Sequence, residues 1–234
     1  MRAAIRRGLV ITGLGLALPA VAGAQPGHAA EALADRMLSA LGGRDNWAAM
    51  KSLVNDSQQN RATDPTVVRA VITMDLTRRR FRIETTGPGL HLIRVVDGDA
   101  HWRRTRDGKI GPIPDDFLAD DLRWHGAHVY RTIHRIARRD PALTVAVGGD
   151  GRLEAHEGGR RLAWFRLDSQ GEPFAFGAYD DEVGSISGPW VIKVKGIAHP
   201  AWTASPDGTW RALLRSIDVS VPLDDSQFVR PAGP

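Results

Sequence analysis

The stretch Thr66–Leu76 alternates strictly in polarity, and this alternation constrains the fold more than any other feature of the chain. Its even-numbered positions from Val68 onward are apolar, whereas Arg69, Thr73 and Asp75 occupy odd-numbered positions. A period of two places successive side chains on opposite faces, which is typical of an antiparallel strand with one buried face. The sequence therefore predicts an antiparallel sheet that is covered on one side.

Further segments repeat the strand pattern, and turn signals separate them. Asp97-Gly98 and Pro206-Asp207-Gly208 are typical hairpin turns, whereas the Gly/Ser-rich segment 184–188 favours a flexible loop. The predicted strands are Thr66–Leu76, Arg80–Glu84, Leu90–Val96, Ala100–Arg106, Leu143–Val147, Gly151–His156, Arg161–Leu167, Phe174–Tyr179, Trp190–Val194 and Arg211–Val221.

Two regions instead show helical spacing. Apolar residues recur every three or four positions over 29–41, and a short second helix follows with Asp45 as its N-cap. Between residues 115 and 139 a helical stripe runs from Leu118 to Ile136, and Gly126 divides it into two pieces. Because the sequence contains no long linker, residues 25–234 are predicted to form one α+β domain that consists of a large antiparallel sheet and helices.

The first 24 residues are typical of an export signal. Arg2, Arg6 and Arg7 precede an uncharged run over 8–24, and Ala22-Gly23-Ala24 has the pattern of a signal-peptidase site. Residues 1–24 are therefore predicted to be a cleaved signal peptide. Because no cysteine stands at the cleavage site, we expect a soluble periplasmic or secreted product without a lipid anchor.

Composition excludes several classes of function. The chain has no cysteine, which rules out a disulfide scaffold, a thiolate metal site and a cysteine nucleophile. Its formal charge is +4, but three arginines lie in the signal peptide, so the mature part carries 28 basic and 27 acidic residues. A nearly neutral exported domain is not expected to bind nucleic acid.

Several short motifs, in this order, resemble those of the bacterial lipoprotein-sorting (LolA-like) superfamily. They are Leu38-Ser-Ala-Leu-Gly-Gly43 with Trp47 and Lys51-Ser-Leu53, Arg80-Phe-Arg-Ile-Glu84, Val96-Asp-Gly98 with Trp102, Lys195-Gly-Ile197 with His199-Pro200 and Asp207-Gly208, and Val221-Pro-Leu-Asp-Asp225 with Phe228 and Pro231. The resemblance implies a strongly curved antiparallel sheet, an incomplete β-barrel whose open side is covered by helices.

The resemblance also implies a function. Acyl chains would lie between the sheet and the helices, and the protein would act as a periplasmic lipid or lipoprotein carrier, or as a sensor. Its partners would be a lipid or an acylated protein, and a membrane-associated protein. Neither a catalytic residue nor a cofactor is expected.

Ten apolar residues are candidates for the walls and lid of such a cavity, although each is also compatible with an ordinary packed core. The wall candidates are Val68, Ile72, Met74, Phe81, Ile83, Trp102, Trp164 and Trp190, and the lid candidates are Leu122 and Ile133.

An alternative interpretation concerns the middle helix. Asp121, His125 and His128 are spaced i, i+4 and i+7, so they would share one face of a continuous helix. Two imidazoles and a carboxylate could ligate zinc or iron. This pattern would support a metal-dependent exported hydrolase or a metal-binding protein, whereas a solvated face or a pH-responsive lid would need no metal.

Overall fold

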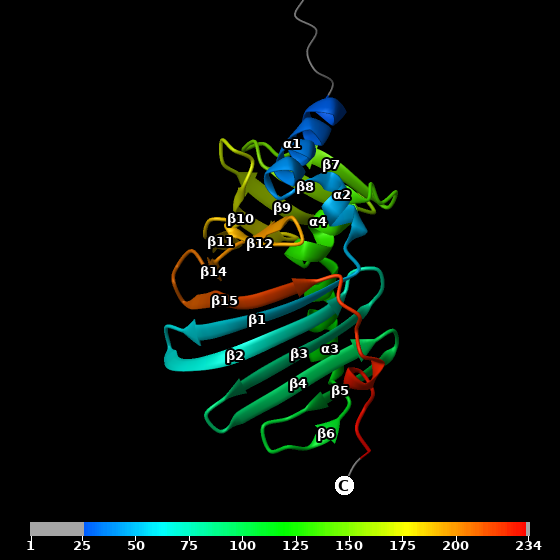
Figure 1. Ribbon diagram of the computed structural model, residues 1–234, viewed down its shortest axis with the longest axis vertical. Helices are drawn as coiled ribbons and strands as arrows, with labels where there is room; N and C mark the ends of the chain where they lie inside the picture. The colour runs from blue at the N-terminus through cyan, green and yellow to red at the C-terminus, as the bar shows by residue number, and fades with distance from the viewer. Residues whose placement is uncertain (1–25, 233–234) are drawn as a thin grey trace, which may run out of the picture.

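One continuous antiparallel sheet of thirteen strands dominates the computed structural model, which describes residues 26–232 (Figure 1). The sheet is strongly curved and is not closed into a barrel. In order across the sheet, the strands are β6 (Ile110–Gly111), β5 (Ala100–Arg104), β4 (Leu90–Asp97), β3 (Arg80–Gly87), β2 (Asp64–Asp75), β1 (Ser52–Arg61), β15 (Trp210–Val219), β14 (Trp202–Ala204), β11 (Ser185–Ser187), β10 (Pro173–Ala178), β9 (Arg160–Leu167), β8 (Leu153–Glu157) and β7 (Leu143–Val147).

Within the described residues four α-helices accompany the sheet, and the predicted α+β fold with a curved, open sheet is confirmed. In Figure 1, α3 and α4 lie behind the sheet, while α1 lies at its upper end. The remaining elements are α1 (Pro26–Ala40), α2 (Arg44–Ala49), α3 (Asp115–Gly126), α4 (Val129–Ala137), the two-stranded sheet of β12 (Ile192–Val194) and β13 (Ile197–His199), and the 3₁₀ turn η1 (Asp225–Gln227). Residues 1–24, predicted to be a signal peptide, lie outside the described residues.

Strand β1 is the main element that the sequence did not predict. It lies between β2 and β15 and pairs with both over most of its length. Its residues from Asn55 to Asn60 are all polar, so hydrophobic periodicity gave no signal there. The sequence also did not predict the short strands β6, β11, β13 and β14. Strand β11 lies in the segment 184–188, for which the sequence favours a loop.

The main hydrophobic core joins the helices to the concave face of the sheet. Met37 of α1, Leu41 directly after that helix, Trp47 of α2 and Ile133 of α4 are fully buried there, together with Phe81 of β3. A second, smaller cluster lies on the opposite, convex face of β4 and β5, where the C-terminal segment covers it. The two clusters show that both faces of this part of the sheet are covered.

None of the described helices has the length and hydrophobicity that a membrane-spanning helix needs.

Candidate functional site

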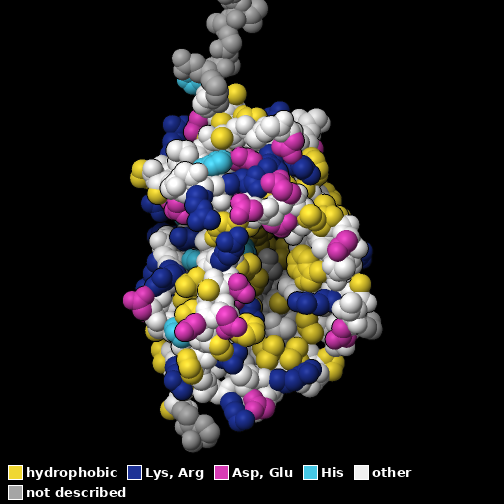
Figure 2. All heavy atoms as spheres, turned by 180° about the vertical axis from the view of Figure 1, so that it is seen from behind, with side chains coloured by type: hydrophobic (Ala, Val, Ile, Leu, Met, Phe, Trp, Pro, Cys, Tyr) yellow, Lys and Arg dark blue, Asp and Glu magenta, His cyan; other side chains and the backbone are white. Residues whose placement is uncertain are grey.

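A cavity of about 450 Å³ separates the concave face of the sheet from the junction of α3 and α4. Figure 2 shows a hollow with apolar side chains on its walls, on the side turned away in Figure 1. The lower wall is a row of cross-strand partners: Asn55 pairs with Ile72, Ile72 with Ile83, and Ile83 with Arg94. Because partners in register point to one face, these four side chains line the cavity together.

Aromatic residues form the opposite wall. Phe165 of β9 and Phe176 of β10 are cross-strand partners, and both line the cavity. Trp202 and Trp210 line it from β14 and from the start of β15, respectively. Gly188 leaves room for this arrangement, because a Cβ atom at this position would lie 2.3 Å from Nε1 of Trp202.

The side of the cavity formed by the α3–α4 junction consists of rings in contact, His128 edge-to-face with Trp124 and stacked on Tyr130. The ring of His128 lies 4.8 Å from that of Trp124 and 5.9 Å from that of Tyr130, while the Tyr130 hydroxyl lies 3.0 Å from Nδ1 of His199. Burial lowers the pKa of His128 to about 4, with a further contribution from Arg131, and burial alone lowers the pKa of His199 to about 4. Both imidazoles are therefore neutral at pH 7, and this side of the cavity carries no positive charge from them.

One ion pair lies within the predominantly apolar lining. Nε of Arg94 lies 2.9 Å from Oδ2 and 3.1 Å from Oδ1 of Asp121, which belongs to α3. Asp121 is only 7% exposed, and its burial raises the pKa of the carboxyl although Arg94 opposes this effect. The pair joins the helical cover to the sheet inside the cavity.

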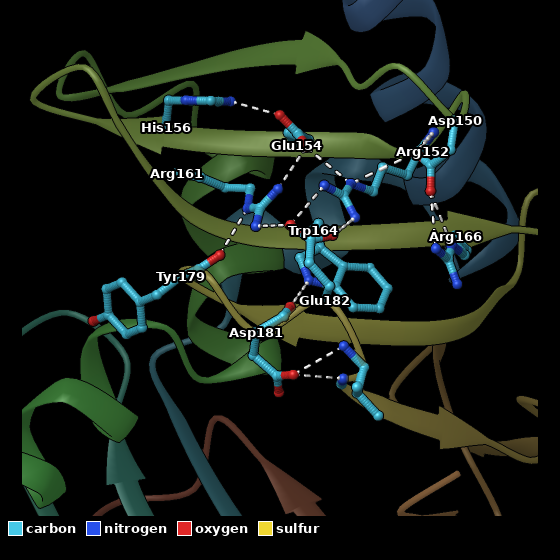
Figure 3. Close-up of polar contacts among 12 residues, drawn as sticks. Asp150, Arg152, Glu154, His156, Arg161, Trp164, Arg166, Tyr179, Asp181 and Glu182 are labelled. Carbon is cyan, nitrogen blue, oxygen red and sulfur yellow. Dashed lines mark hydrogen bonds and ion pairs between the residues drawn. The ribbon is translucent and has the colours of Figure 1, made fainter.

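The loop between β10 and β11, residues 179–184, forms part of the cavity rim and contacts both the helices and the sheet. Tyr179 donates a hydrogen bond of 2.9 Å to the carbonyl oxygen of Arg123 in α3, and the Arg123 guanidinium lies 3.9 Å from the Tyr179 ring centroid. On the convex face, Glu182 forms ion pairs with Arg152 and Arg161 (Figure 3). These contacts anchor the loop both to the sheet and to the helical cover.

The three candidate metal ligands do not come together. The helix that carries Asp121 and His125 ends at Gly126, so His128 lies beyond it, at the N-terminus of α4. Asp121 is paired with Arg94, and the His125 ring is stacked on that of Phe81 at 4.8 Å. Within residues 26–232, no three histidine or acidic side chains are grouped in a way that could hold a metal ion. The break at Gly126 is the physical reason for this difference from the predicted helical face.

The ten predicted cavity residues occupy several environments. Ile72, Ile83 and Trp190 line the cavity. Met74, Phe81 and Ile133 are fully buried in the main core, and Leu122 packs against that core. The remaining three lie elsewhere: Trp102 belongs to the convex-face cluster, Trp164 lies beside Arg152 and Arg166, and Val68 is half-buried on β2.

Several cavity residues were not among the candidates from the sequence. Asn55, Ser57 and Gln59 belong to β1, which carries no apolar period. Trp202 lies in β14, and Trp210 is the first residue of β15. Only their aromatic side chains could have indicated that they line a cavity. None of these five residues lies in a segment whose alternating polarity predicts a strand, so the sequence did not indicate them as cavity residues.

A second hollow, of about 930 Å³, lies between α2, the end of α4 and the C-terminal segment. Half of its lining residues are charged, and several of these charges already have partners: Arg78 pairs with Asp75, and Arg80 with Asp225. The smaller cavity has the predominantly apolar lining that is typical of ligand sites, so it is the stronger candidate.

Comparison with known proteins yields matches only in structure: no family model and no curated protein matches the chain. Similar solved structures include a DUF1329 family protein from Desulfovibrio piger, with 12% identity and a TM-score of 0.45 over 87% of this chain and 97% of that chain. An uncharacterized conserved protein from Thermus thermophilus has 14% identity and a TM-score of 0.33, with 85% and 91% coverage. A putative outer membrane lipoprotein-sorting protein domain from Vibrio parahaemolyticus has 7% identity and a TM-score of 0.36, with 85% and 95% coverage.

Proposed function

We propose that this protein is an exported, non-catalytic carrier or sensor that binds an acyl chain between its curved sheet and its helices. The observation that supports the proposal is the 450 Å³ cavity, whose walls are mainly aliphatic and aromatic side chains. Small-molecule sites typically enclose about 300–1,000 Å³ with this kind of lining.

The energetics of acyl-chain burial suit such a site. Each methylene group transferred from water contributes about 0.8 kcal/mol, and micromolar affinity corresponds to about 8 kcal/mol. Roughly ten buried methylene groups would therefore supply this affinity before the costs of ordering are subtracted. A predominantly apolar cavity meets this requirement without a metal or a cofactor.

The sequence supports an address in the periplasm. Residues 1–24 have the order of a signal peptide, and the chain contains no cysteine that could carry a lipid anchor. The ligand would then be a lipid or the acyl group of a lipidated protein, which a membrane-associated partner would supply or receive.

The test fills the cavity from a single strand. Ala212 of β15 lines the cavity and is 8% exposed, whereas the next residue, Leu213, is 45% exposed and is not part of the cavity lining. In delipidated protein we expect Ala212→Trp to weaken binding of a fluorescent fatty acid by about tenfold or more, because the indole occupies ligand volume. Leu213→Trp, the matched control, should bind as the unmodified chain does.

The unmodified protein also provides a direct test. Organic extraction of natively purified protein, followed by mass spectrometry, should release an acyl-containing molecule. If no lipid is extracted and the fluorescent fatty acid fails to bind the delipidated protein, the proposed function is wrong. Equal binding by both tryptophan variants would place any binding outside this cavity.

A further inference from the structure

Two arginines lie side by side on the concave face at the α3 end of the cavity. Arg94 of β4 and Arg103 of β5 are direct cross-strand partners in the antiparallel register. The side chains of such partners are separated by about 5 Å at Cβ, and like charges in this position repel each other. The fold therefore concentrates positive charge at one end of an apolar cavity.

The acidic residues of α3 compensate this charge only in part. Asp121 pairs with Arg94, but Arg103 has no ion-pair partner among residues 26–232, and its guanidinium lies 5.8 Å from the centroid of the Phe117 ring. Asp116 and Asp120 are exposed on the same helix and form no ion pair with a described residue. Of the two adjacent guanidinium groups, only that of Arg94 is thus paired with a carboxylate of the described residues.

The guanidinium of Arg94 also retains free hydrogen-bonding capacity. Its Nε donates a hydrogen bond to the Asp121 carboxylate, whereas Nη1 and Nη2 form no hydrogen bond with the described part of the protein. The side chain is 36% exposed and, among the described residues, is the single cation that lines the cavity. A guanidinium with two free nitrogens suits a carboxylate or a phosphate group.

We infer that the cavity selects a single-headed anionic amphiphile whose carboxylate or phosphate binds Arg94 and whose acyl chain lies along the Ile83–Ile72 row. The inference rests on the proposed function and adds the chemical class of the ligand. Arg94 and Asn55 are separated by three strand spacings, or about 14 Å, so this row offers an extended path for the chain.

Asp121 has a predictable part in this selection. Its carboxylate lies beside the place where the ligand's anion would bind, so it competes for Arg94 and repels the incoming charge. Removing the negative charge of Asp121 should therefore strengthen anion binding, whereas removing the positive charge of Arg94 should weaken it. Opposite effects from two partners of one ion pair are not expected from a purely structural role.

The experiment compares palmitate with 1-hexadecanol, an uncharged probe with the same chain length, at pH 8 in delipidated protein. We expect the unmodified chain to bind palmitate about tenfold more tightly than hexadecanol, as a charge-assisted contact allows. Arg94→Gln should remove this preference by weakening palmitate binding alone, and Asp121→Asn should tighten palmitate binding about threefold or more. Arg69→Gln is the matched control, since Arg69 is a strand arginine paired with Asp56 on the other face, and it should change neither affinity.

Two further probes separate the sources of the anion. Acetate and inorganic phosphate alone should not displace palmitate at millimolar concentration, because they lack the chain. A lysophosphatidate that binds more tightly than palmitate would identify a phosphate headgroup, and weaker binding would identify a carboxylate; both results agree with the inference.

The results that contradict the inference differ from those that contradict the proposed function. Equal affinity for palmitate and hexadecanol, or palmitate binding unchanged in Arg94→Gln, would overturn the anion site and leave a cavity for neutral lipids. Failure of both probes to bind would overturn both proposals. Circular dichroism and thermal unfolding verify that each variant is folded, and if Arg94→Gln does not fold, a loss of palmitate affinity in Asp121→Asn overturns the inference.

Discussion

Gly177 of β10 lies against the indole of Trp164, and no other residue fits this position. A Cβ atom at Gly177 would lie 2.5 Å from three atoms of the Trp164 ring. The ring cannot move aside easily, because it is fully buried and Nε1 donates a hydrogen bond of 2.6 Å to the carbonyl oxygen of Asp181 (Figure 3).

We expect Gly177→Ala to lower the free energy of unfolding by about 1–3 kcal/mol, as overpacking in a well-packed site does. Gly111→Ala is the control, since a Cβ atom at that strand position meets nothing within 4 Å. Urea denaturation of both variants provides the measurement. Equal stability of the two variants would show that the Trp164 site accommodates the methyl group.

The two faces of β9 show what the sequence could and could not predict for a single residue. The alternation correctly separated Trp164 from Ala163 and Phe165, but it did not indicate which face is concave. The sequence makes Trp164 a cavity candidate, whereas Ala163 and Phe165 line the cavity in the structure. The direction of curvature depends on the whole sheet and the helices on it, so no local pattern encodes it.

Arg44 connects three helices. From α2, its Nη1 donates hydrogen bonds of 2.8 and 2.9 Å to the carbonyl oxygens of Ile136 and Ala137 at the C-terminal end of α4. Nη2 lies 2.6 Å from Oδ1 of Asp35 in α1. One guanidinium thus satisfies helix-end carbonyls and an acidic side chain at the same time.

We expect Arg44→Ala to lower the free energy of unfolding by about 1–3 kcal/mol, because two helix-end carbonyls lose a charged donor. Arg138→Ala removes an exposed arginine from the same end of α4, one whose side chain has no hydrogen bond within the described residues, and should cost only a few tenths of a kcal/mol. Urea unfolding of the two variants would distinguish a specific connection from a general charge effect.

The buried histidines make the α3–α4 region sensitive to acid. Burial lowers the pKa of His125 to about 3, with Arg131, His128 and Arg79 adding to the effect and Asp75 opposing it, and it lowers the pKa of His128, His134 and His199 to about 4. In the unfolded chain histidine titrates near about 6.5, so between these values the unfolded state binds more protons. The free energy of unfolding should therefore be highest above about pH 6.5 and fall as the pH drops towards about 4.

Each histidine contributes up to about 1.4 kcal/mol per pH unit in this window. His125→Phe keeps a ring stacked on Phe81 but does not titrate, so its unfolding free energy should depend less steeply on pH by about one proton. Urea unfolding at several pH values between about 7.5 and 4.5 measures both slopes. Identical slopes would show that His125 is not a source of the acid sensitivity.

At the level of elements, the sequence predicted what apolar periodicity can encode. The strands with alternating residues and the two-part helix around Gly126 appear at the expected positions. Strand β1 remained hidden because its residues beyond Val54 are polar, and its place in the sheet depends on pairing with β2 and β15. For the same reason the sequence did not predict that Asn55, Ser57 and Gln59, which belong to β1, line the cavity.

The C-terminal segment closes the convex side of the molecule. Phe228 packs on the cluster of Ile93, Val95 and Trp102, its carbonyl oxygen accepts a hydrogen bond of 2.9 Å from Nε1 of Trp102, and its ring lies 3.9 Å from the guanidinium of Arg80. These contacts hold the segment around Phe228 against strands from the first half of the chain.

We expect Phe228→Ala to lower the free energy of unfolding by about 2–4 kcal/mol, because a buried ring is replaced by a methyl group. Val229→Ala, which changes a neighbouring residue that is 65% exposed, should cost less than about 0.5 kcal/mol. Thermal unfolding gives both values. A small effect of Phe228→Ala would show that the segment covers the sheet without stabilising it.

The pairing of β1 with β15 also sets the order in which the molecule can form. The two strands pair from Leu53↔Val219 to Arg61↔Trp210, with one register shift between Asp56 and Ser57, so partners at the centre of the sheet lie far apart along the chain. Contacts between such distant segments carry a large loop-closure entropy and slow folding. Until the last strand is available, β1 has one open edge and the two halves of the sheet cannot join. A chain built in this way cannot complete its sheet until nearly all of its residues have been synthesised.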